Sequence, residues 1–176
     1  MANIFLLEAA SLFLGDADPT AAKHLTLDSL ALPELEYVTV DHHGGGAAGE
    51  ISMSMNSIRK IEPTFKLAGF DADSYRLFTA GAGAPTKYTA YGVLRSKQDG
   101  KALQAKTVIT GVLGRLAPDA FDRSQKLGHD HRIVEVTHYE LMVAGEEWFY
   151  WDYFTTKRRR LGIDELAEVR TMLGLQ

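Results

Sequence analysis

The sequence predicts a mainly β fold, an antiparallel β-sandwich or barrel with one short helix and a second helix near the C-terminus. β-Branched and aromatic residues recur in runs bounded by Gly, Pro, Asp and Asn, as strands do. Residues 51–56 alternate Ile, Met and Met with Ser, Ser and Asn, which is the period of two of a strand. Asp99-Gly100 separates two further strand-like runs, a pattern typical of an antiparallel hairpin.

Length and charge restrict the class of protein further. The chain has 176 residues, which favours one domain over residues 1–176, and a formal net charge of −4. A negative chain has no general attraction for phosphate backbones, so any nucleic acid would be guided loosely rather than held tightly. No cysteine is present, which excludes a disulfide framework and a thiolate metal site.

The N-terminal apolar run, residues 4–14, is expected to form a strand. Glu8 interrupts it and no Lys or Arg precedes Lys23, so the run lacks the pattern of a signal peptide. Elsewhere no uncharged apolar run reaches the ~20 residues that a membrane helix needs. We therefore expect no membrane anchoring.

Residues 41–50 read DHHGGGAAGE and are predicted to form a flexible loop. Three consecutive glycines cost too much chain entropy for the interior of a packed strand or helix. The candidate contact residues of this loop are Asp41, His42, His43, Gly44, Gly45, Gly46 and Glu50.

Two long hairpins are expected after the loop. Residues 86–94 and 102–113 flank the turn at 98–101, and residues 131–143 precede 148–155 across a turn in which Gly145 supplies a left-handed conformation. Glu146 and Glu147 are expected to be solvated in that second turn. Apolar and polar side chains share both faces of 131–143, which is typical of a strand between a core and a channel or a neighbouring subunit.

Two helices complete the prediction. Asp71 or Asp73 caps a short helix that Gly81 ends. Residues 164–173 form the second helix, which begins with Asp164, ends before Gly174 and docks its apolar stripe on a sheet.

Four histidines are the only candidates for metal ligands. His42, His43, His129 and His131 have poor ligand spacing, since adjacent strand residues point to opposite sides, and solvated loop histidines are the competing interpretation. No nucleophile elbow, phosphate-binding loop or dinucleotide fingerprint is present. The sequence therefore predicts no cofactor and no enzyme; a histidine-based metal enzyme and a small-ligand-binding barrel remain alternatives.

Residues 148–154 hold six aromatic side chains in seven positions. Such residues favour cores and protein interfaces, and a stacking platform for single-stranded nucleic acid is disfavoured because Asp152 stands where Lys or Arg would be expected. The candidate interface residues are Trp148, Tyr150, Trp151 and Tyr153. The basic run that follows is either a solvated connection or a docking point for an acidic partner. It consists of Lys157, Arg158, Arg159 and Arg160.

The order of these parts resembles the major tail tube proteins of contractile-tailed phages and of R-type tailocins. The motifs that carry the resemblance run from residue 23 onward, and they are KHLTL at 23–27, FKLAGF at 65–70, YGVL at 91–94, YELMVAGE at 139–146, LGIDEL at 161–166, Arg170 and LGL at 173–175. A type VI secretion ring that carries effectors is the related alternative.

The resemblance implies hexameric rings that share a continuous inner β-barrel and stack into a hollow tube. It implies contacts with the tail sheath, the baseplate and the tape-measure protein, and DNA that passes loosely through the lumen of a phage tail. It places the protein in the inner tube of a virion tail, assembled in the cytoplasm of the bacterial host. Residues 41–50 then become an inter-ring contact and residues 157–160 a candidate sheath contact.

Overall fold

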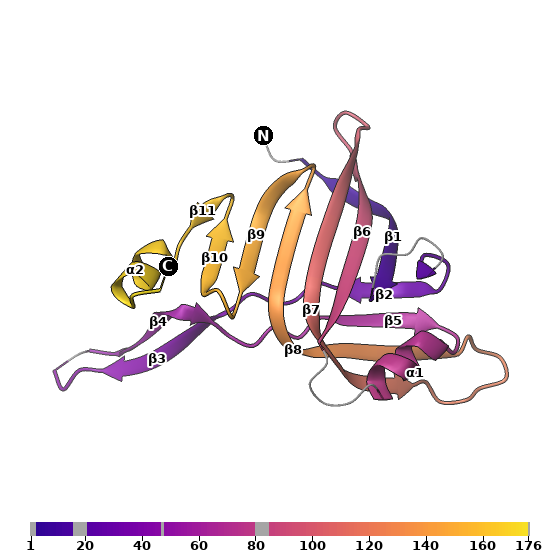
Figure 1. Cartoon of the computed structure of the whole chain (residues 1–176), viewed down its shortest axis with the longest axis horizontal. Helices are drawn as coiled ribbons and strands as arrows, with labels where there is room; N and C mark the ends of the chain where they lie inside the picture. The colour runs from indigo at the N-terminus through magenta and orange to yellow at the C-terminus, as the bar shows by residue number, and fades with distance from the viewer. Residues whose placement is uncertain (1–2, 16–20, 47, 80–84, 176) are drawn as a thin grey trace.

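The computed structural model describes residues 3–15, 21–46, 48–79 and 85–175. Within these ranges the chain forms a large antiparallel sheet, a separate two-stranded sheet and two helices, so the predicted mainly β class is confirmed (Figure 1). The large sheet has the order β1-β6-β7-β8-β9-β10-β11, while β5 pairs with β8 and β2 pairs with β5. The elements are β1 (Phe5–Leu14), β2 (Leu27–Ala31), β3 (Tyr37–His43), β4 (Glu50–Ile58), β5 (Thr64–Ala68), α1 (Ala72–Thr79), β6 (Thr86–Ser96), β7 (Ala102–Pro118), β8 (Gly128–Val143), β9 (Glu146–Asp152), β10 (Lys157–Arg160), β11 (Ile163–Asp164) and α2 (Ala167–Met172).

The two longest strands, β7 and β8, carry the chain around a corner of the sheet. Their register slips at Gly111 and at Gly114, and Glu135 in β8 has a positive φ of 48°. Such bulges bend a strand, so the start of β8 pairs with β5 in a second layer beneath the upright strands (Figure 1). A Cβ atom on Gly114 would lie 2.3 Å from a methyl carbon of Val134, which leaves no room for any larger residue.

The hydrophobic core fills the inside of this corner. Burial raises the pKa of Tyr88 and of Tyr139 to about 12, as expected for phenols in a dry interior. Phe65 lies 6.4 Å from the Tyr88 ring, between centroids, and joins the two layers. The other fully buried apolar side chains of this cluster are Leu12, Ile61, Leu67, Ala90, Ile109, Leu113 and Ile133.

The predicted N-terminal strand and both predicted hairpins are present. β1 pairs with β6 and slips register at Glu8, whose carboxylate lies 2.9 Å from the Arg95 guanidinium. Gly100 (φ 71°) and Gly145 (φ 83°) supply the left-handed turn positions. The second turn is tighter than predicted, because Glu146 and Glu147 belong to β9 and pair with β8.

The first helix begins as predicted at Asp71. Its carboxylate accepts hydrogen bonds from the backbone N–H and the hydroxyl of Ser74, at 2.9 and 2.7 Å. Lys23 joins Asp71 and Asp73 at 2.7 and 2.8 Å and fixes the helix to the segment before β2. The predicted terminator, Gly81, lies outside the described residues. Neither helix in the described ranges has the length and apolar character needed to cross a membrane.

The prediction for the C-terminal helix was wrong in two respects. α2 spans only Ala167–Met172, because Asp164 belongs to β11 and its carboxylate accepts from the Leu166 N–H and pairs with Arg170. None of the α2 residues is buried, and Met172 is 77% exposed, so the helix does not dock on a sheet. Gly174 ends the element with a φ of 71°, as predicted.

Candidate assembly surfaces

Strands β3 and β4 form a two-stranded arm, residues 37–58, that projects from the body of the molecule (Figure 1). The predicted boundaries of the 41–50 loop were wrong. Asp41, His42 and His43 end β3 and Glu50 begins β4, because they pair across the hairpin, so the connecting segment that contains Gly44, Gly45 and Gly46 is shorter.

The arm has an apolar and a polar face, and both are exposed. Residues directly opposite in an antiparallel pair share a face, so Val40 and Met53 lie with Ile51 on one side, and Asp41 and Ser52 lie on the other. The exposed fractions of Val40, Ile51 and Met53 are 49%, 60% and 47%. An isolated two-stranded hairpin is marginally stable in water, so this apolar face is suited to contact with another molecule.

The large sheet also has one bare face. Val108, Glu140, Tyr150 and Arg159 are successive cross-strand partners on β7, β8, β9 and β10, so they share that face, while Tyr139 between them points into the core. We call this surface the polar face; it is formed by Tyr91, Lys106, Glu140, His138, Tyr150, Asp152 and Arg159.

The cations of the polar face are held by other side chains. The Arg159 guanidinium lies 3.8 Å from the centroid of the Tyr150 ring and 2.6 Å from the Glu147 carboxylate. Hydrogen bonding between Arg159 and Glu147 raises the pKa of the arginine and lowers the pKa of the carboxyl. Glu147 is therefore not a solvated turn residue as predicted, since this ion pair holds it.

Partial burial acts to raise the pKa of Asp152, but hydrogen bonds from Thr155 and His138 outweigh it and lower that pKa. The Asp152 carboxylate lies 3.3 Å from Nδ1 of His138, whose ring meets the Tyr150 ring edge-on at 5.1 Å. The polar face thus carries charges of both signs, and Arg159 and Asp152 are each held by a partner.

The basic run does not present four free cations. The Arg158 side chain is 4% exposed, donates from Nε to Glu165 at 2.8 Å and also donates to Asn56, so it is part of the interior. Arg159 is held by Glu147 as above. The expectation that Arg158 and Arg159 dock a partner is corrected accordingly; Arg160, with a 69% exposed side chain, and the half-buried Lys157 remain accessible.

The four aromatic candidates divide between two environments. Trp151 packs against the core and Tyr150 lies on the polar face. Trp148 is 45% exposed and Tyr153, beyond the end of β9, is 65% exposed. Their place in a subunit interface stays a prediction.

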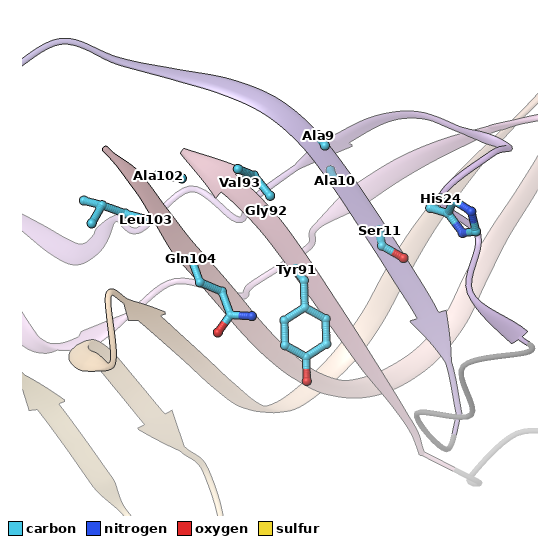
Figure 2. Close-up of a pocket in the computed structure, with 10 residues that line it drawn as sticks. All are labelled: Ala9, Ala10, Ser11, His24, Tyr91, Gly92, Val93, Ala102, Leu103 and Gln104. Carbon is cyan, nitrogen blue, oxygen red and sulfur yellow. The ribbon is translucent and has the colours of Figure 1, made fainter. Parts of the chain in front are cut away.

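Two hollows lie on and beside β1, β6 and β7. The smaller one, about 410 Å³, is lined by Ser11, His24, Tyr91 and Gln104 among others. Figure 2 shows that the Tyr91 and Gln104 side chains point away from their strands in a similar direction. The larger groove, about 810 Å³, is mainly apolar. Its large apolar lining residues are Leu7, Leu27, Leu30, Leu32, Leu94, Leu141, Val143 and Trp148.

The four histidines do not come together as a metal site. His42 and His43 lie on the arm, whereas His129 and His131 are in β8 with ring centroids 6.1 Å apart. In the described part of the chain no cluster of three or more metal-ligating side chains occurs.

His129 and His131 are also not solvated loop residues, as the competing interpretation held, because both are about 98% buried. Nδ1 of His129 donates to the Gly69 carbonyl at 2.7 Å, and the His131 ring stacks on Phe65 at 4.5 Å. Neither nitrogen of His131 has a hydrogen-bond partner among the described residues. Burial, and then the proximity of His129, lower the pKa of His131.

Comparison with known proteins identifies the fold and the family. The sheath/tube terminator of an extracellular contractile injection system, PVC, in its extended state has a TM-score of 0.54 at 11% identity, covering 78% of this chain and 95% of that one. A chain of the PVC sheath-tube complex in the extended state has a TM-score of 0.52 at 11% identity, covering 76% and 88%. A search of curated proteins gives no match.

A family model described as phage tail tube protein FII matches residues 21–174. The match covers every described helix and strand except β1, and it confirms the resemblance that the sequence motifs predicted. The chain belongs to the phage tail tube protein FII family and has the structural role of a tail tube subunit.

Proposed function

We propose that this subunit assembles into hexameric rings that share an inner β-barrel and stack into the tube of a contractile phage tail or tailocin. The observation that carries the proposal is an apolar, exposed arm attached to a body whose own core is complete. A finished monomer would bury Val40, Ile51 and Met53, whereas a repeating assembly leaves them for the next copy.

The sheet edges support closure by neighbouring copies. β1 and β11 end the strand order of the large sheet and do not pair with each other in the described ranges. The start of β1 offers an open edge, with Ile4 beside it 70% exposed and Leu6 48% exposed, while the Leu12 carbonyl further along accepts a hydrogen bond from the Lys23 N–H. Long apolar edges promote aggregation unless they are paired or covered, and a ring of copies pairs them.

The polar face is the proposed lining of the bore. The opposite face of the same strands carries the core and the larger apolar groove, whereas the polar face carries charged groups of both signs. The Arg159 guanidinium lies 2.6 Å from the Glu147 carboxylate, and the Lys106 ammonium lies 5.9 Å from the centroid of the Tyr91 ring. A wall with paired charges attracts phosphates weakly, which suits loose passage of DNA.

The tip of the arm, from Asp41 to Glu50 in the hairpin, is the proposed inter-ring contact. The sheath contact is assigned to Lys157 and Arg160, the accessible members of the basic run. The baseplate and the tape-measure protein complete the partners, and the protein resides in the inner tube of a tail assembled in the bacterial cytoplasm. The subunit acts structurally and carries no enzymatic activity.

Negative-stain electron microscopy of concentrated protein, alone and with baseplate, tests the assembly. We expect rings or tubes with a central hole. Met53→Asp places a carboxylate on the apolar face of the arm and should abolish them, since an unpaired buried charge is costly. Ser54→Asp is the matched control, because it places the same charge on the polar face one residue away.

Wild-type protein that stays monomeric under every assembly condition would overturn the proposal. Equal loss of tubes in Met53→Asp and Ser54→Asp would remove the apolar face as the contact and leave the rest of the assembly to be mapped.

A further inference from the structure

The base of the arm is joined to the C-terminal segment through one buried arginine. Arg158 in β10 donates from Nη2 to the side-chain oxygen of Asn56, near the end of β4, and from Nε to the Glu165 carboxylate at 2.8 Å. Its guanidinium carbon lies 5.5 Å from the centroid of the Tyr37 ring, at the start of β3. One side chain thus contacts both strands of the arm and the segment after β11.

This arginine is held firmly on its own side. Glu165 pairs with Arg160 at 3.0 Å as well, and its backbone N–H donates to the Arg158 carbonyl at 2.8 Å. Burial of 96% of the Arg158 side chain leaves the guanidinium little freedom, and a buried guanidinium needs these acceptors. The direction of the Nη2 donor towards Asn56 is therefore set by the C-terminal segment.

The other contacts at the base of the arm allow it to pivot. Ile58 packs partly against the core, and the Arg59–Glu36 ion pair at 3.2 Å joins two residues that are both more than half exposed. Exposed pairs of this kind contribute little. β3 and β4 pair with each other and with no strand of the large sheet in the described residues.

We propose that Arg158 is a positioning residue that fixes the direction of the arm relative to the C-terminal segment, residues 157–175. The arm then projects in one orientation before it meets any partner. An oriented arm loses less conformational freedom on binding than a pivoting one. This last consequence, for tube assembly, rests on the proposed function; the orientation itself is a property of the single subunit.

Distance measurements between spin labels test the orientation in the isolated subunit. The natural chain has no cysteine, so Thr39→Cys on the arm and Glu168→Cys on α2, both exposed, provide two unique labels. We expect a narrow distance distribution. Asn56→Ala removes only the acceptor on the arm and keeps the Arg158–Glu165 pair, so it should broaden the distribution, with minor orientations roughly tenfold more populated.

Three further variants separate positioning from general stability. Asn56→Asp restores an acceptor for Arg158 and should restore the narrow distribution, whereas a simple loss of fold would not be rescued. Ser52→Ala removes a hydrogen bond to Asp41 within the arm and leaves the base intact, so it is the matched control and should leave the distribution unchanged. Arg158→Met, which keeps the volume and leaves Glu165 paired with Arg160, should broaden it as Asn56→Ala does.

A distribution that stays narrow in both Asn56→Ala and Arg158→Met overturns the proposal. Broadening in those variants with unchanged thermal unfolding of the body supports it. Electron microscopy of the same variants addresses the other question: if wild-type protein forms no tubes, the proposed function fails while the distance data still decide the role of Arg158.

Discussion

The body and the arm of this subunit are built from the same strand-forming residues, yet their apolar side chains have opposite environments. Leu67 in β5 is fully buried and Tyr139 in β8 is 2% exposed, whereas Ile51 and Met53 in β4 are 60% and 47% exposed. The body closes its own core through the corner in β7 and β8. The apolar face of the arm at Ile51 and Met53 is left exposed, so the difference separates the residues that stabilise the subunit from those that are available for assembly.

The largest effect should come from deleting a buried side chain of the body. Leu67→Ala leaves a cavity in the core and should lower the free energy of unfolding by about 2–5 kcal/mol. Met53→Ala on the arm should change it by no more than about 0.5 kcal/mol, because solvent already contacts that side chain. Urea denaturation of both variants measures the contrast. A comparable loss in both would mean that the arm contributes to the cooperative unit.

Filling the corner of the body should have the next largest effect. Gly114→Ala forces a methyl group against Val134 and should cost about 1–3 kcal/mol of unfolding free energy. Gly45→Ala is the matched control in the arm, where a Cβ atom would meet nothing within 4 Å. Thermal unfolding distinguishes them; a neutral Gly114→Ala would show that the corner relaxes freely.

Acid should weaken the body before it weakens the arm. The folded protein lowers the pKa of His131 from its ordinary value of 6.5, so the unfolded chain binds a proton that the folded chain resists. Stability is therefore complete above pH 6.5 and falls as the pH drops below it, by at most about 1.4 kcal/mol per pH unit for one proton.

Two carboxyls that interact with these histidines titrate at lower pH, because their ordinary pKa is 3.8 and the fold lowers it. They are Asp71, which acts on His131, and Asp119, which acts on the neighbouring His129. His131→Phe, which keeps a ring against Phe65, should flatten the loss between pH 6.5 and 5 in chemical denaturation curves. His43→Phe on the exposed arm should leave it intact. An unchanged slope in His131→Phe would show that His131 is not the source of the acid sensitivity.

The smallest effect is expected at the exposed end of the basic run. Arg160→Ala removes a 69% exposed partner of Glu165, which keeps Arg158, so the unfolding free energy should change by less than about 0.5 kcal/mol. Arg158→Ala, two residues away, should cost about 2–5 kcal/mol because deleting a side chain that is 96% buried leaves a cavity. Differential scanning calorimetry of the two variants compares them, and equal costs would contradict the burial of Arg158.

Local patterns predicted most of the strands but not what covers them. Asp99-Gly100 and Gly145 located both long hairpins, because turn chemistry acts within a few residues. The alternation at 51–56 predicted a strand correctly and gave no sign that both of its faces are exposed. The glycines of 44–46 extended the predicted loop over His42 and His43, whose strand pairing depends on partners across the hairpin.

Long-range contacts explain the remaining differences. The sequence pattern did not distinguish Arg158 from the other cations of the basic run. Its contacts with Asn56, 102 residues earlier, and with Glu165 make it an interior residue. The apolar stripe near the C-terminus predicted a docked helix, yet no residue of α2 is buried in the single subunit. His129 and His131 are core residues because β5 and α1 cover them, and their spacing in the sequence does not predict this burial.

The contact between Asn56 and Arg158 also has a consequence in time. A ribosome makes the chain from its N-terminus at about 5–20 residues per second, so the hairpin emerges long before its anchor, 102 residues later, has been translated. A nascent chain therefore lacks this contact until residue 158 has been translated. On the proposals above, the hairpin gains its fixed direction only after that point, so it is made earlier than it is ready for assembly.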